Sequence, residues 1–230
     1  MIKIITSGAF AAALEKALPI YKSKYGLNYQ LFYGSSFGEA HDSIPNRIKK
    51  GEFFDFFFLA EGALDNYIRN NYIDAKSKIN LVNSRIGIAI KEDGRSFSVN
   101  NEVSFVKMLI ECKSIAYAAS ASGIYLCNDV FPLISNKILI KSKKIMSERV
   151  GNIVLRGEAE VGFQQLSELL PIKGLKILGG LPNQYDKSFI FSAGCNDDTD
   201  YKAEYFKFID VLTNSDEFKT VIEKTGVKLL

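Results

Sequence analysis

The sequence has no tryptophan, one histidine, three cysteines and five prolines among its 230 residues. With a single histidine and no Cys-x-x-Cys pair, it lacks the ligand spacing of a zinc site, so no bound metal is expected. Cys112, Cys127 and Cys195 lie far apart in the sequence and are predicted to be unpaired thiols. Because no phosphate-binding glycine loop or Ser-His-Asp order stands out, no cofactor is expected either.

The chain also has little net charge and no long apolar run. Lysine and arginine number 29 against 26 acidic residues, so no nucleic-acid partner is expected. The longest apolar run, 53–60, is interrupted by Asp55 and is too short to span a bilayer. Met1 leads directly into an apolar stretch without the basic and apolar regions of a signal peptide. We therefore expect a cytoplasmic protein, or a periplasmic one whose signal peptide has been removed.

The opening stretch supplies the first functional signal. A β-branched run over 2–6 predicts a strand, and the Ala-rich segment after it predicts a helix ending near Gly26. Ser7 and Gly8 form the tight turn between them. A helix that opens at the carboxyl end of a strand presents N–H groups and the positive end of its dipole, which suits an anion.

Two later turns repeat this arrangement. Residues 31–33 run into Gly34-Ser35-Ser36, and residues 114–119 run into Ser120-Ala121-Ser122-Gly123. Three such turns predict one anion-binding site with three helix N-termini. The alternative is structural, because strand-to-helix turns in any α/β protein favour serine and glycine.

The order of predicted elements is that of an α/β protein. Further strands are expected at 28–33, 53–59 and 81–91, with helices between them, which is a doubly wound order. A second unit begins after Lys91, with strands at 114–119 and 159–163 and helices at 105–112, 123–132 and 150–156. The basic stretch 137–145 is interpreted as a solvated face. The last two helices, 202–213 and 215–225, follow no new sheet and are expected to return to the first unit.

Taken in order, several motifs resemble the molybdate-binding-protein-like branch of the type II periplasmic solute-binding proteins. They are Ser7-Gly8-Ala9-Phe10, Gly34-Ser35-Ser36, Ile44-Pro45-Asn46-Arg47, the segments 120–126 and 156–171, Leu181-Pro182 and Phe191-Ser192-Ala193-Gly194. The resemblance implies two doubly wound α/β lobes, 1–84 with 190–230 and 85–189, joined by two crossing strands near 82–86 and 187–191. It also implies a ligand enclosed between the lobes by a hinge motion.

The sequence departs from true molybdate binders at two places. Phe163-Gln164-Gln165 stands where those proteins carry a ligand-binding tyrosine, and the loop 37–44 is longer. The longer loop is similar to that of a subgroup associated with organic acids, which includes bacterial aconitate isomerase. The resemblance therefore implies a small-anion binder, for an organic di- or tricarboxylate or an inorganic oxyanion, serving an ABC-type transporter. The alternative is an isomerase of a small unsaturated tricarboxylate that acts by proton transfer.

The candidate residues come from these motifs. Arginine geometry suits a carboxylate clamp, although a surface ion pair is the alternative for both arginines. The predicted ligand-binding residues are Ser7, Gly8, Ala9, Ser35, Ser36, Arg47, Ser122, Gly123, Arg156 and Gln164. An isomerase needs a proton-transfer group, and His41 is the candidate, with an exposed loop histidine as the alternative. Glu158, Glu168 and Tyr33 are weaker candidates. The expected partners are the small anion and a transporter permease, and the chain is expected to be a monomer.

Overall fold

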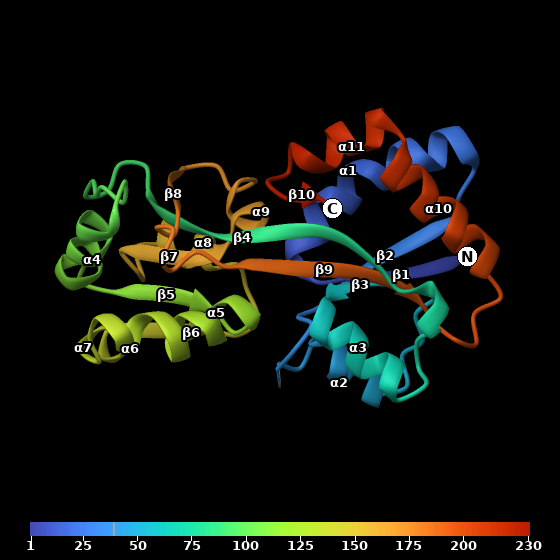
Figure 1. Ribbon diagram of the computed structural model, residues 1–230, viewed down its shortest axis with the longest axis horizontal. Helices are drawn as coiled ribbons and strands as arrows, with labels where there is room; N and C mark the ends of the chain where they lie inside the picture. Colours follow the sequence, from blue (N-terminus) through green and yellow to red (C-terminus); the bar gives the residue numbers. More distant parts are fainter. Residues whose placement is uncertain (39) are drawn as a thin grey trace. The chain divides into compact units, whose positions relative to one another are not determined.

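The computed structural model describes residues 1–38 and 40–230. The chain divides into two compact units: unit 1 comprises 1–84 and 189–230, and unit 2 comprises 85–188. The second boundary predicted from the sequence lies one residue later. Two strands, β4 (Ile79–Lys91) and β9 (Ser188–Cys195), each contain residues of both units (Figure 1).

Unit 1 contains a mixed sheet in the order β2-β1-β3-β9. Strand β1 pairs in parallel with β2 and β3, whereas β3 pairs antiparallel with β9. Besides β4 and β9, the elements of unit 1 are β1 (Ile2–Thr6), α1 (Gly8–Tyr25), β2 (Tyr29–Tyr33), α2 (Ile44–Lys49), β3 (Phe56–Ala60), α3 (Glu61–Arg69), η1 (Ala75–Ser77), α10 (Lys202–Asn214), α11 (Asp216–Glu223) and β10 (Lys228–Leu229). The two-residue β10, which was not predicted from the sequence, pairs with β4.

Strand β3 shows why helices cover both faces of this sheet. Successive side chains of a strand point to opposite faces. Phe56 and Phe58 belong to the core formed with α1, α10 and α11, whereas Phe57 and Leu59 belong to the core beneath α2 and α3. All four are buried, so the continuous apolar run reflects burial on both faces, and the predicted doubly wound α/β class is confirmed.

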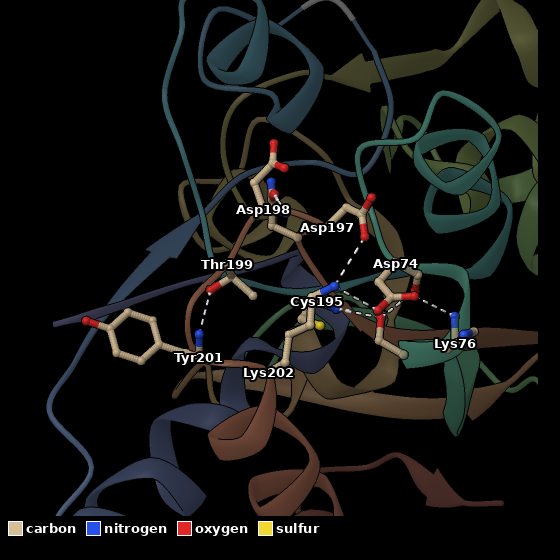
Figure 2. Close-up of polar contacts among 10 residues, drawn as sticks. Asp74, Lys76, Cys195, Asp197, Asp198, Thr199, Tyr201 and Lys202 are labelled. Atoms are coloured by element: carbon tan, nitrogen blue, oxygen red, sulfur yellow. Dashed lines mark hydrogen bonds and ion pairs between the residues drawn. The ribbon is translucent and has the colours of Figure 1, made fainter.

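The C-terminal segment is part of unit 1 and is attached to it by polar contacts as well as by packing. Helix α11 packs against α1 and α10. At the start of α10, the Nζ of Lys202 contacts Asp74 at 3.0 Å and Asp197 at 3.2 Å (Figure 2). Buried Asp55 accepts hydrogen bonds from the Lys3 N–H (2.7 Å) and the Thr199 hydroxyl (2.6 Å). These contacts give each carboxylate oxygen of Asp55, the residue that interrupts the apolar run 53–60, a hydrogen-bond donor.

Unit 2 has the strand order β8-β4-β7-β5-β6, with β5 parallel to β6 and β7, and with β4 antiparallel to β7 and β8. Its elements are α4 (Glu102–Glu111), β5 (Ile115–Ala118), α5 (Ala121–Tyr125), the π-helical turn η2 (Leu126–Val130), α6 (Phe131–Ile134), α7 (Lys137–Ile140), β6 (Ser142–Ile145), α8 (Val150–Leu155), β7 (Val161–Gln165), α9 (Leu166–Leu169) and β8 (Leu175–Gly180). The stretch interpreted as a solvated basic face contains α7 and β6. Strand β6 is an edge strand with the sequence Ser-Lys-Lys-Ile, whose adjacent lysines give no alternating strand pattern.

The sheet of unit 2 also has two covered faces. Helix α8 packs on β5 and β7, and its Val150, Ile153 and Val154 share a core with Ala116 and Ala118 of β5. The opposite face is aromatic. The Phe163 ring lies 5.7 Å from that of Phe131 and 6.4 Å from that of Phe105, which come from α6 and α4.

Candidate functional site

The carboxyl ends of three parallel strands meet at one edge of unit 1. Thr6, the last residue of β1, lies opposite Tyr33 of β2 and Phe58 of β3. Each strand therefore delivers its following turn to the same edge. Residues 7–8 follow β1, residues 34–36 follow β2, and α3 begins directly after β3. This edge brings together the first two turns predicted from the sequence.

Ser7 and Gly8 open α1 as predicted. Ser7 is the N-cap residue in an extended conformation, and its hydroxyl makes no capping hydrogen bond to the helix. The hydroxyl instead lies 3.5 Å from the Phe58 carbonyl, a contact too long to hold it firmly. Ala9 follows in the first turn and is buried. The positive end of an 18-residue helix dipole thus lies beside a weakly engaged serine hydroxyl.

The second turn differs from its prediction because no helix begins there. The chain continues as a loop, and α2 starts only at Ile44, with Ser43 as its N-cap. The Ser35 hydroxyl donates to the Phe37 carbonyl (2.7 Å), and the Ser36 hydroxyl accepts from the Ala60 N–H (3.0 Å). The second helix start at this edge is therefore that of α3. This helix was predicted from the sequence, but its start was not assigned to the anion site, because the β3–α3 junction contains no serine.

Arg47 has partners within unit 1. Its Nε and Nη2 donate to the Glu52 carboxylate, at 3.0 and 2.7 Å from Oε2, and Nη1 donates to the Tyr33 carbonyl at 2.9 Å. The guanidinium carbon lies 5.1 and 5.2 Å from the ring centroids of Phe32 and Phe54. The Arg47 guanidinium holds the pKa of Glu52 below its usual value. These contacts of Arg47 anchor α2 to the rest of unit 1. A ligand-binding role for Arg47 stays a prediction.

His41 lies in the loop before α2 with its side chain 82% exposed. Its Nδ1 is 4.0 Å from an Asp42 carboxylate oxygen, the limit of an ion pair. The Lys50 ammonium donates to its carbonyl at 3.2 Å. The geometry fits the exposed-loop alternative, and a catalytic part for His41 stays a prediction. Glu39, which precedes it in this loop, lies outside the described residues.

A matching strand edge exists in unit 2. Tyr117 of β5 lies opposite Phe163 of β7 and Lys144 of β6, so these three strands end together. Ser120 is the N-cap of α5, and its hydroxyl shares a 2.9 Å hydrogen bond with that of buried Ser122. Gly123 is required here, because a Cβ would lie 1.9 Å from the Ala118 carbonyl oxygen. Because Gly123 has no side chain, the helical run that starts at Ala121 can pack directly against the end of β5.

Gln164, at the end of β7, is held by the protein at both ends of its amide. Its Oε1 accepts from the Val150 N–H at the start of α8 (2.8 Å), and its Nε2 donates to the Glu168 carboxyl (2.5 Å). Burial raises the pKa of Glu168 to about 7, against the opposing effects of Arg149 and of the Gln164 hydrogen bond. A carboxyl that titrates near neutrality can hold or release a proton. Glu168 was only a weak candidate from the sequence, because the residues around it do not indicate that its carboxyl is shielded from water.

Arg156 is not brought to this edge. Helix α8 begins beside Gln164 at the carboxyl end of β7, and Arg156 follows the opposite end of the helix. Its guanidinium bonds Glu148 at 2.9 Å and Glu158 at 2.6 Å in an exposed ion-pair cluster. Arg156 keeps the pKa of both carboxyls below the usual value. The structure therefore gives Arg156 partners away from Ser122 and Gln164.

The described part of the chain contains no group of three metal-ligating side chains placed to hold an ion. Cys112, Cys127 and Cys195 are unpaired, as predicted. Among the described residues, no helix is both long enough and apolar enough to cross a bilayer.

The sequence matches the family described as bacterial extracellular solute-binding protein over residues 2–228. It is 29% identical over 229 residues to an aconitate isomerase from Pseudomonas sp, covering 99% of this chain and 87% of the relative. The fold is similar to that of the periplasmic molybdate-binding protein of Azotobacter vinelandii, with a TM-score of 0.77, 18% identity and full coverage of both chains. It is also similar to PEB3 of Campylobacter jejuni with L-phospholactate bound, with a TM-score of 0.76, 12% identity and 99% of both chains covered. These similarities confirm the predicted type II periplasmic binding protein fold.

Proposed function

The chain belongs to the family of bacterial extracellular solute-binding proteins, and we propose that it binds a small organic anion, a di- or tricarboxylate, for an ABC-type transporter. The observation that carries the proposal is the pair of polar strand edges, one in each unit. Each edge combines serine side chains with the start of a helical segment. Such sites bind anions with neutral hydroxyl and N–H donors and with the helix dipole.

In unit 1, Ser7 is the residue best suited to contact the ligand. Within 1–38 and 40–230, its hydroxyl has only the 3.5 Å contact with the Phe58 carbonyl, so it can turn toward an anion at little cost. Gly8 and Ala9 supply the first turn of α1 beside it. Ser36 is more firmly held, because its oxygen accepts from the Ala60 N–H. Its hydroxyl proton is the group that it offers to a ligand.

In unit 2, the Ser120–Ser122 hydroxyl pair and the Gly123 turn form the corresponding edge. Either serine can be the donor in that pair, so the second proton is the one available to an anion. Gln164 contributes indirectly, because its amide already binds Val150 and Glu168. We propose that it acts by holding the start of α8 in place.

The choice of a carboxylate over molybdate rests on two supports. One is the aconitate isomerase relative, whose name gives a tricarboxylate as its substrate. The other is the Phe163-Gln164-Gln165 segment, which has no tyrosine where the molybdate-binding branch carries one. Inorganic oxyanions are the competing class, and the binding experiment must include them.

The test is calorimetric titration with trans-aconitate, citrate, molybdate and sulfate on the unmodified chain and on S7A and S122A. We expect a tricarboxylate to bind, and each serine variant to weaken binding by about tenfold, since each loses a hydrogen bond to a charged group. S98A is the matched control, because Ser98 is exposed and far from both turns in sequence. If no anion binds, or if both serine variants bind like the control, the proposal fails.

A second candidate function is isomerisation of an unsaturated tricarboxylate. It is favoured by the relative named as an aconitate isomerase and by Glu168, whose pKa of about 7 suits proton transfer at neutral pH. In such a reaction a base takes a proton from the methylene carbon beside a carboxylate. The double bond then shifts, and a proton returns to the former alkene carbon.

This candidate is tested by following cis- and trans-aconitate by proton NMR in D2O. Interconversion abolished in E168Q would assign the proton-transfer role to Glu168, and interconversion abolished in H41N would assign it to His41. If trans-aconitate binds and is recovered unchanged, without deuterium, the enzymatic alternative is excluded while the binding function stands.

The remaining expectations concern partners and location. We propose that the protein acts outside the cytoplasmic membrane, in the periplasm, as a monomer that delivers its ligand to a permease. The family description supports an extracellular location. Light scattering behind size exclusion tests the monomer, and fractionation of the source cells tests the location.

A further inference from the structure

Unit 1 contains a pocket of about 430 Å³ that the strand edge does not explain. It lies between α2 and α3, with Ile48 and Lys49 from α2, Gly62, Tyr67 and Arg69 from α3, and Phe37 from the preceding loop. A pocket of this size is large enough for a small organic molecule. Its walls are mainly apolar, so the occupant must carry an apolar body.

The charged residues of this pocket are all cationic. Lys49 and Arg69 line it, and neither makes an ion pair with a residue in the described ranges 1–38 and 40–230. No acidic side chain within those ranges lines the pocket. Arg47 on the same helix, by contrast, is neutralised by Glu52. Two cations without counter-charges favour an anionic occupant.

The third feature is the aromatic ring of Tyr67, which lines the pocket. The ring is held by Phe57 and Tyr72, with centroids 6.3 and 5.9 Å away. The Tyr67 hydroxyl is buried and lacks a hydrogen-bond partner among the described residues, so the ring and not the hydroxyl meets the pocket. A fixed aromatic wall favours an occupant with an apolar body that can pack against it.

We propose that the α2–α3 pocket is a second binding site, for a small carboxylate carried on an aromatic or branched apolar body. The apolar body packs against Phe37 and Ile48. The Tyr67 ring forms part of the wall beside this body, and Lys49 and Arg69 offset the charge of the carboxylate. This pocket shares Ser36 with the strand edge, but its lining includes neither Ser7 nor the first turn of α1.

The experiment uses benzoate as the probe, with benzamide as its neutral analogue and inorganic phosphate as an anion without an apolar body. Amide chemical shifts of the labelled full chain are followed by heteronuclear NMR. We expect benzoate to cause saturable shifts in α2 and α3, and benzamide and phosphate to bind at least about tenfold more weakly. Failure of benzoate to shift those amides at about 20 mM, or equal binding of benzamide, would overturn the proposal.

Three substitutions locate the site. G62L fills the pocket from an exposed helical position, where an added Cβ meets only the Phe37 ring at 3.9 Å, and it should abolish benzoate binding. Y67L removes the aromatic ring that lines the pocket and should weaken benzoate about tenfold, in a protein whose circular dichroism spectrum is that of the unmodified chain. R69Q should weaken benzoate more than benzamide.

The matched controls are K16Q and S7A. Lys16 is an exposed cation on α1, outside the pocket, so K16Q should bind benzoate normally. S7A impairs the proposed strand-edge site and should also leave benzoate binding unchanged. If G62L binds benzoate like the unmodified chain, or if S7A abolishes its binding, the pocket is not the site.

Discussion

The two units use the same turn at the edge of a sheet but differ in the environment of one carboxyl each, Asp55 in unit 1 and Glu168 in unit 2. In unit 1, Asp55 receives two hydrogen bonds, from the Lys3 N–H and the Thr199 hydroxyl. In unit 2, Glu168 receives one from the Gln164 amide, and burial raises its pKa to about 7. Asp55 therefore ties together segments far apart in the chain, whereas Glu168 can change its charge near neutral pH.

The turns themselves differ in tightness. A Cβ on Gly123 would lie 1.9 Å from the Ala118 carbonyl oxygen and 2.9 Å from the Tyr117 ring. A Cβ on Gly34 would lie 2.7 Å from the Asp42 carbonyl oxygen and 2.9 Å from the Ile44 side chain. In unit 2, the atoms that a Cβ on Gly123 would meet belong to strand β5, which cannot shift. In unit 1, the atoms that a Cβ on Gly34 would meet lie at the loop before α2, which can shift.

The largest effect is expected from this pair of glycines. G123A should lower the free energy of unfolding by about 3 kcal/mol or more, and G34A by about 1–2 kcal/mol, because only the loop facing Gly34 can shift. Urea unfolding followed by circular dichroism measures both. Equal losses would mean that the two turns are equally constrained, contrary to the geometry.

Asp55 tests the carboxyl of unit 1. D55N replaces one acceptor oxygen with an amide that faces a donor, so the Lys3 N–H or the Thr199 hydroxyl loses its partner. We expect a loss of about 2–3 kcal/mol in the free energy of unfolding. T199V removes the hydroxyl donor alone and should cost less. A D55N protein as stable as the unmodified chain would show that this contact does not anchor the C-terminal segment.

Glu168 should behave in the opposite way. Its folded-state pKa of about 7 lies above the ordinary glutamate value of 4.5, so the folded state retains a proton that the unfolded state releases. Stability is then fully present below about pH 4.5, falls as the pH rises to about 7, and is lower by about 2–3 kcal/mol above it. E168Q should remove this fall and be the more stable protein at pH 8.

The control for this prediction is E158Q, since Arg156 lowers the pKa of Glu158 and the exposed pair cannot produce a loss of stability with rising pH. Urea unfolding at pH 5 and pH 8 measures all three proteins. An unchanged pH dependence in E168Q would remove Glu168 as the titrating group.

The smallest contrast is between the two arginines. R47A loses the Glu52 pair, the Tyr33 carbonyl and packing on two rings, and should lower the free energy of unfolding by about 2 kcal/mol. R156A removes an exposed ion pair and should leave the unfolding midpoint unchanged. R47K keeps the charge but not the two-pronged contact, and should fall between them. If R47A is neutral to stability but weakens anion binding, Arg47 is a ligand residue after all.

Much of the fold could be predicted from the sequence because its signals are local. The first strand, the first helix and the end of that helix follow from short-range preferences: the β-branched run Ile2–Thr6, the alanine-rich α1 and Gly26, which has φ 76°. Strand β6 was missed, because an edge strand with two adjacent lysines looks like a solvated surface. The turn at 34–36 was interpreted as a helix start, because serine and glycine mark a turn without specifying the next element.

For the candidate site, the sequence by itself determined which donors exist and where they leave a strand: Ser7, Ser36 and Ser122 are polar turn residues whatever their surroundings. Only the tertiary structure decided their partners. It committed Ser36 to Ala60, neutralised Arg47 with Glu52, held Gln164 at both ends and placed Arg156 at the far end of α8. It also shielded part of Glu168 from water and left the Tyr67 hydroxyl without a partner among the described residues. Burial and pairing depend on residues distant in the chain, and no local pattern encodes them.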